Sequence, residues 1–274
     1  MCVAAQLADF RGTRLMLNIT DHSKHGKIAV LGYQNTAVNL HTGPNAMLLH
    51  LPAGKPMSQK NFIDATGCKH IFDDMKRAVT PVRRGMDYPI GSSGGDRSFV
   101  VFDHDIYTVV LAKDARDIPV ALKQVPPEKR PFISRELCEF YFDSYFDHSI
   151  ILCCFNNRDA RKALPLLIWY NRPKADLQTL PAIDCHTGGV PDLEESVQVD
   201  HWVFVASDNM QNGSTVHYQD EAAQSKVMGT FLPKKVVGRE FHGLHTNGDF
   251  GFKVSRLESS DFSTGDIMRI HPEW

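Results

Sequence analysis

The chain has 274 residues, of which 42% are hydrophobic and 23% are charged, and its formal net charge is -2. A chain of this length and composition can bury a sizeable core, so extensive disorder is not expected. Thirty Lys and Arg residues balance 32 Asp and Glu residues, and no dense basic cluster occurs. This balance argues against nucleic acid or an anionic membrane as the main partner.

The N-terminus has a short apolar run before Asp9 and no basic leader, and no window reaches the ~20 apolar residues of a membrane helix. Cys153 and Cys154 are adjacent in an apolar run, and no cysteine pair has Cys-x-x-Cys spacing. These features favour reduced, buried thiols over a disulfide framework. We therefore expect a soluble, cytoplasmic protein.

The chain is expected to begin with β-structure. Alternating apolar residues predict two short strands within 2–19 that flank a turn at 9–12, and two further strands at 28–40 and 46–51. A helix is predicted over 68–79, where Ile71, Met75 and Val79 share one face and Thr80-Pro81 ends it.

Residues 81–97 form the segment most biased towards Gly, Ser and Pro, which is typical of a linker or a mobile loop. β-Branched and aromatic residues resume at 98–103 and 106–111, as in continued sheet. We therefore expect one domain over 1–274 with a mobile loop near 81–97.

Two helices are predicted next, one at 117–125 and one that begins after Ser134. Ser134 is a suitable N-cap, and Leu137, Tyr141 and Tyr145 belong to an apolar stripe with helical spacing.

The segments 149–155, 164–170 and 199–206 are apolar on both alternating faces, as in strands covered on both sides. Asn247-Gly248 is a strong hairpin signal, and it predicts that 239–246 pairs with 249–257. The fold class that follows is α+β, with a mixed or mainly antiparallel sheet core covered by a few helices.

The loop Asp184–Gly189, with sequence DCHTGG, carries the most suggestive chemistry. A nucleophilic thiol needs a base and a carboxylate to orient that base, and Cys185, His186 and Asp184 supply these groups. A metal could take the same residues as ligands, so metal and cofactor dependence stay open. A structured turn without function is the plain alternative.

Asp200 and His201 are candidates to reach this loop from the following strand. Because neighbouring strand residues point to opposite faces, they are not expected to form a ready-made dyad, and each needs a partner from elsewhere. His242 and His245 are expected to lie on a strand, where positions three apart face opposite ways and disfavour a metal site.

The main hypothesis is a soluble intracellular hydrolase that uses Asp184, Cys185 and His186, with Asp200 or His201 contributing. One alternative is a non-catalytic interaction or assembly protein. A second is an N-terminal-nucleophile amidohydrolase that uses Cys2, whose amine and thiol would serve as base and attacking group. The expected partners are a small-molecule or peptide substrate, with an oligomer as an open alternative.

Overall fold

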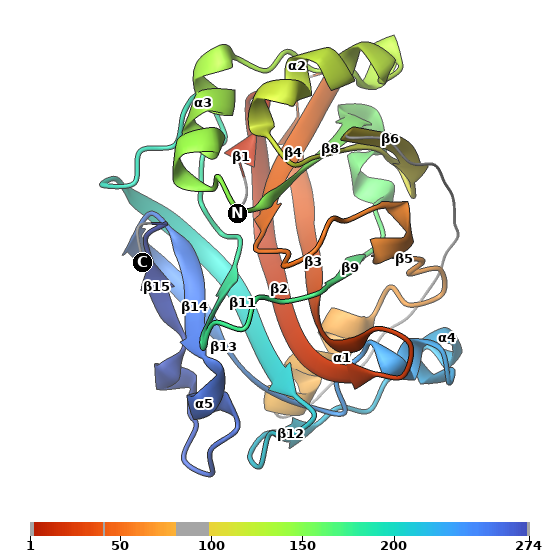
Figure 1. The fold of residues 1–274 in the computed structure, drawn as a ribbon, viewed down its shortest axis with the longest axis vertical. Coiled ribbons are helices and arrows are strands. Elements are labelled where there is room, and N and C mark those ends of the chain that lie inside the picture. Colours follow the sequence, from red (N-terminus) through yellow and green to blue (C-terminus); the bar gives the residue numbers. More distant parts are fainter. Residues whose placement is uncertain (1–2, 41, 81–98, 273–274) are drawn as a thin grey trace.

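The computed structural model describes residues 3–40, 42–80 and 99–272, and Figure 1 shows how its elements are arranged. Cys2 and the predicted loop at 81–97 lie outside the described residues. The strands are β1 (Val3–Ala4), β2 (Ala8–His22), β3 (Gly26–Leu40), β4 (Pro44–Leu51), β5 (Phe62–Ile63), β6 (Phe99–His104), β7 (Tyr107–Ala112), β8 (Ser149–Asn156), β9 (Leu166–Tyr170), β10 (Leu177–Leu180), β11 (Ser196–Ser207), β12 (Ser214–Thr215), β13 (Lys235–Thr246), β14 (Asp249–Lys253) and β15 (Met268–Ile270). The α-helices are α1 (Ile71–Val79), α2 (Ile118–Ala121), α3 (Arg135–Ser144), α4 (Glu221–Gln224) and α5 (Val254–Leu257).

These strands form three sheets. A five-stranded sheet has the order β1-β4-β8-β7-β6, a seven-stranded sheet has the order β12-β13-β11-β2-β3-β9-β5, and a small sheet has the order β10-β14-β15. All pairings between these strands are antiparallel except that of β2 with β11, which is parallel. The fold is therefore α+β with a mainly antiparallel core, as the sequence predicts.

The five-stranded sheet is covered on both faces. Alternate side chains of β8, such as Ile150 and Leu152, pack with α2 and α3 in one apolar cluster. The intervening residues Ile151 and Cys153 join a larger cluster with the seven-stranded sheet. Every residue of β8 is buried, which confirms the expectation from its two apolar faces.

Helix α1 covers another part of the seven-stranded sheet, at the end of the molecule away from α2 and α3 (Figure 1). Phe72 of α1 packs against Phe204 of β11, with ring centroids 6.3 Å apart. Gly32 of β3 leaves room for this contact, since a Cβ there would lie 3.0 Å from the Phe72 ring.

The predicted helix after Ser134 is confirmed as α3. The Ser134 hydroxyl accepts a hydrogen bond from the Leu137 N–H at 3.1 Å, which satisfies one of the free donors at the helix start. Helix α1 begins at Ile71, a few residues later than predicted. The helix predicted at 117–125 is a short α-helix flanked by 3-10 turns.

Two local predictions were wrong. The segment expected to turn at 9–12 continues as one long strand, β2, and a register irregularity between Arg11 and Arg14 absorbs Gly12, whose φ is +58°. The predicted hairpin about Asn247-Gly248 does not form, because β13 pairs with β11 and β12 while β14 pairs with β10 and β15. Asn247-Gly248 is instead the corner at which the chain changes sheets.

No helix in the described part of the chain is long and apolar enough to cross a membrane.

Candidate functional site

The site lies where β2 and β11 separate. The two strands pair in parallel only from Trp202 and Arg14 onward. Before that point β2 stays with β3, while β11 pairs with β13 from Ser196. The Gly12 N–H donates to Oδ2 of Asp200 at 2.8 Å and bridges the two strands close to the point where they part. The seven-stranded sheet thus contains a gap on one side of β11.

The predicted loop closes one end of this gap. Its carbonyls accept backbone hydrogen bonds from the N-terminal segment, Cys185 from Ala4 at 2.8 Å and His186 from Ala8 at 3.0 Å. Gly188 allows this close approach, because its φ is +81° and a Cβ there would lie 2.6 Å from the carbonyl oxygen of Ala5. The loop is therefore fixed against the sheet.

Asn247 holds the same loop from the other side. Its amide nitrogen donates to the carbonyls of Asp184 at 2.8 Å and Asp192 at 2.9 Å, and its Oδ1 accepts from the Asp184 N–H at 2.8 Å. Asn247 is buried, with 1% of its surface exposed. The sequence analysis did not predict this role, because Asn-Gly is a frequent turn signal and was interpreted only as a hairpin turn.

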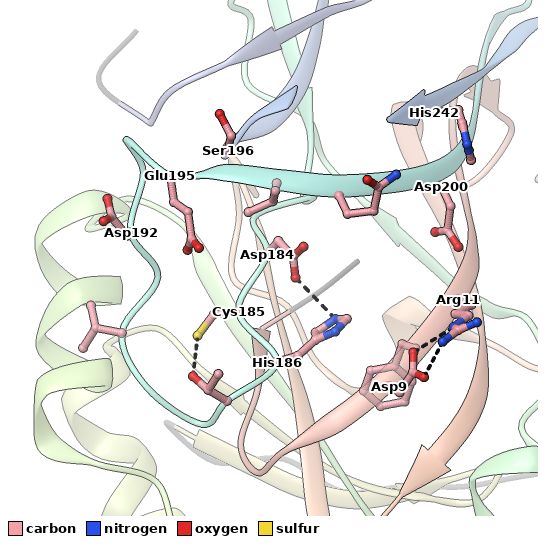
Figure 2. Close-up of a pocket in the computed structure, with 15 residues that line it drawn as sticks. Asp9, Arg11, Asp184, Cys185, His186, Asp192, Glu195, Ser196, Asp200 and His242 are labelled. Atoms are coloured by element: carbon pink, nitrogen blue, oxygen red, sulfur yellow. Dashed lines mark hydrogen bonds and ion pairs between the residues drawn. The ribbon is translucent and has the colours of Figure 1, made fainter. Parts of the chain in front are cut away.

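The loop and the two parting strands line an open pocket of about 660 Å³ (Figure 2). Its walls come from three places: the start of β2, the loop with the residues that follow it, and the first half of β11 with one residue of β13. The lining residues are Asp9, Phe10, Arg11, Asp184, Cys185, His186, Thr187, Val190, Asp192, Glu195, Ser196, Val197, Gln198, Asp200 and His242.

Asp184 and His186 point toward one another in this pocket (Figure 2), with Oδ1 and Nε2 3.4 Å apart. Burial raises the pKa of Asp184 to about 6, and the neighbouring Glu195 and Asp200 act in the same direction while Arg269 opposes them. Burial also lowers the pKa of His186 to about 4. At neutral pH the imidazole is therefore neutral and the carboxyl is mainly ionised.

The thiol of Cys185 is directed away from the His186 imidazole (Figure 2). Its Sγ lies 3.3 Å from Oγ1 of Thr187 and donates to the carbonyl of Gly189 at 3.5 Å. These contacts belong to the loop itself. Cys185 and His186 share the pocket wall, but the structure does not join them in a nucleophile–base pair.

Asp200 and His201 lie on opposite faces of β11, as strand alternation predicts. Asp200 lines the pocket, whereas His201 is buried next to Phe250 of β14, with ring centroids 5.9 Å apart. The Asp200 N–H donates to Nδ1 of His201 at 3.2 Å, and Oδ1 of Asp200 lies 3.8 Å from the same nitrogen. Of the two, only Asp200 faces the loop site.

The pocket is negatively charged. Five carboxylates line it, and its one arginine, Arg11, is paired with Asp9 at 2.9 Å. Asp192 and Glu195 contribute from the segment that precedes β11. The patterns used for the sequence interpretation did not point to Asp9, Asp192 or Glu195, since an isolated carboxylate in a polar segment carries no local signal.

His242 also lines the pocket, whereas the imidazole Nε2 of His245 lies 3.3 Å from the carbonyl of His242. Among residues 3–40, 42–80 and 99–272, no group of three His, Cys, Asp or Glu side chains is placed to hold a metal ion. None of the described cysteines forms a disulfide; they are Cys68, Cys138, Cys153, Cys154 and Cys185.

No protein-family model matches the chain, and no curated protein sequence matches it. Among solved structures, the crystal structure of baculovirus P35 is similar, with a TM-score of 0.46 and 13% sequence identity over 94% of this chain and 92% of that chain. A mutated baculovirus P35 after caspase cleavage has a TM-score of 0.44 and 12% identity, over 89% of this chain and 91% of that chain. Similarity at this level does not identify a function for the chain.

Proposed function

We propose that the chain is a non-catalytic interaction protein and that the pocket between β2 and β11 is its binding site. The observation that supports this proposal is the direction of the Cys185 thiol, which contacts Thr187 and Gly189 instead of His186. A thiol becomes a good nucleophile when a base or a cation favours its thiolate form. Among the described residues, the loop places neither a base nor a cation in contact with this thiol.

The alternative is the hydrolase in which His186 acts as base and Asp184 orients it. The 3.4 Å contact between these two side chains is the feature that favours it. That mechanism requires Cys185 to turn towards the imidazole, which would break both contacts of its Sγ within the loop.

One experiment on the purified protein separates these functions. Wild type, Cys185→Ser and His186→Ala are assayed against a broad panel of esters and amides. We expect all three proteins to remain at the background rate. A wild-type activity that both substitutions abolish, with unchanged stability, would establish the hydrolase instead.

Binding is tested with a displayed library of random peptides. We expect the wild type to enrich peptides whose binding is lost in Gln198→Trp, which places a large ring in the pocket. Gln124→Trp is the matched control, because Gln124 is exposed and does not line the pocket. If no enriched peptide distinguishes these two variants, the pocket is not the binding site.

A further inference from the structure

We infer that the pocket binds an extended, basic segment of a partner protein, which adds as a strand to the open edge of β11. This inference rests on the proposed function and specifies the ligand of the same site. Two independent features support it: a strand edge that lines the pocket and that no described segment pairs over residues 196–200, and an excess of carboxylates around that edge.

The open edge is a consequence of the sheet topology. Over residues 196–201, β11 pairs with β13 on one side, but β2 joins its other side only from Trp202. Apart from the pairing with β13, no backbone hydrogen bond from a described segment reaches residues 196–200. Ser196, Val197, Gln198 and Asp200 of this stretch line the pocket. Unpaired N–H and C=O groups of this kind are the template on which an extended peptide adds as a further strand.

The charge of the pocket selects the kind of peptide. Asp184, Asp192, Glu195 and Asp200 surround the open edge, and the lining cation Arg11 is already paired with Asp9. His186 is neutral at neutral pH, because burial lowers its pKa to about 4. Lys or Arg side chains on alternate positions of an added strand would face these carboxylates, since alternate residues of a strand share one face.

Two of these carboxyls have oxygens that accept no hydrogen bond from the described residues. The Asp184 side chain is 10% exposed, lines the pocket and accepts no hydrogen bond from the described residues; its contact is the 3.4 Å approach to His186. Oδ1 of Asp200 is buried and has no hydrogen-bond partner among the described residues. Buried polar groups are normally satisfied, and a donor on the ligand would satisfy these.

The probe is a fluorescent peptide of alternating Lys and Thr, about seven residues long, which spans the open edge at ~3.3 Å per residue. Anisotropy at low and moderate salt measures its binding to the full chain. We expect Asp200→Asn and Glu195→Gln each to weaken binding about three- to fivefold, as for partly exposed ion pairs. The isosteric Asp200→Asn keeps an oxygen for the Gly12 N–H. Glu128→Gln, an exposed position that does not line the pocket, should leave affinity unchanged.

Two further peptides test the strand geometry and the charge. Methylation of alternate backbone nitrogens removes the donors an added strand needs, so we expect affinity to fall at least about tenfold. A Glu-Thr peptide of equal length should not bind. In hydrogen exchange, the Lys-Thr peptide should slow the amides of residues 196–200.

The inference is overturned if the methylated peptide binds as tightly as the unmodified one, if the Glu-Thr peptide binds equally well, or if light scattering shows that a second copy of the chain occupies the pocket. In the first two cases, pocket-dependent enrichment of other displayed peptides would still support the proposed function. The two proposals therefore fail separately.

Discussion

The carboxyl of Asp184 and the imidazole of His186 lie 3.4 Å apart, and burial disfavours the charged form of both. Desolvation raises the pKa of the acid and lowers the pKa of the base. The two groups therefore make stability change with pH in opposite directions. The pair should therefore make little net contribution to the pH dependence of folding, although each member alone contributes strongly.

Single substitutions of this pair should reveal two opposite slopes. The folded-state pKa of Asp184 rises from 3.8 to about 6, so the folded protein holds more protons than the unfolded one between these values and loses stability as pH rises. The pKa of His186 falls from 6.5 to about 4, so its contribution is present above 6.5 and is lost as pH falls through 4. Each effect is on the order of 3 kcal/mol.

As pH rises from 4 to about 6, the stability of Asp184→Asn relative to wild type should therefore increase. The stability of His186→Gln relative to wild type should decrease over about the same range. Urea unfolding at several pH values measures both differences. Parallel slopes for the two variants would contradict the assignment.

Gly188→Ala should destabilise the protein by about 2–3 kcal/mol, because a Cβ would strike the carbonyl of Ala5 and the backbone has a φ that Ala adopts poorly. Gly189→Ala is the matched control. Its Cβ would meet only Oγ1 of Thr187, at 3.3 Å. Thermal or urea unfolding should show the large loss for Gly188 alone, and equal losses would mean that the loop is not fixed as described.

A buried polar network beside the site joins β4, β14 and Tyr145, the residue that follows α3. Asp249 accepts hydrogen bonds from the Tyr145 hydroxyl at 2.8 Å and the Ala182 N–H at 2.8 Å, and its Oδ2 lies 2.9 Å from Nε2 of His50. His50 holds the pKa of Asp249 below its ordinary value despite complete burial, together with these hydrogen bonds.

Asp249→Asn should cost about 3 kcal/mol, because it removes a buried carboxylate that accepts hydrogen bonds from Tyr145 and Ala182 and contacts His50. Tyr145→Phe removes only the hydroxyl and should cost about 1.5–2 kcal/mol. Urea unfolding at neutral pH ranks the two variants. A larger loss for Tyr145→Phe would show that the hydrogen bond of the Tyr145 hydroxyl, not the charge of Asp249, contributes most to this network.

Asp200 and His201 should behave differently although they are neighbours. His201 is 1% exposed and packs near Phe250, so His201→Ala should cost about 2–3 kcal/mol of stability. Asp200→Asn should change stability by less than about 1 kcal/mol, since the amide keeps the bond from Gly12. Unfolding curves of the two variants at neutral pH check this contrast, and equal losses would contradict it.

The elements that the sequence predicted well are those whose signals are local. Ser134 begins α3 because its hydroxyl meets a donor three residues later, within the same turn. The burial of β8 on both faces follows from its uninterrupted apolar side chains. Strand alternation also separated Asp200 from His201 correctly, because it depends only on the backbone of one strand.

The site was predicted only in part, because its shape depends on contacts between distant segments. The loop Asp184–Gly189 was predicted as a site from the types of its residues. The direction of the Cys185 thiol, however, follows from the loop backbone, which Gly188 and Asn247 fix. The Asn-Gly signal predicted a hairpin, yet the strands on its two sides pair in different sheets, through contacts that lie far apart in the sequence.

By itself, the sequence determined the α+β class, the best helix, the doubly buried strands and the loop Asp184–Gly189 as a place of concentrated chemistry. Local propensity, capping and alternation suffice for these features, since each acts within a few residues. Only the tertiary structure decided that β2 leaves β11 at Trp202, and that Asp9, Glu195 and Asp200 share one pocket with that loop. This arrangement depends on contacts between β2 and β11, whose residues Gly12 and Asp200 are 188 positions apart in the sequence. No local pattern encodes a contact between segments so far apart.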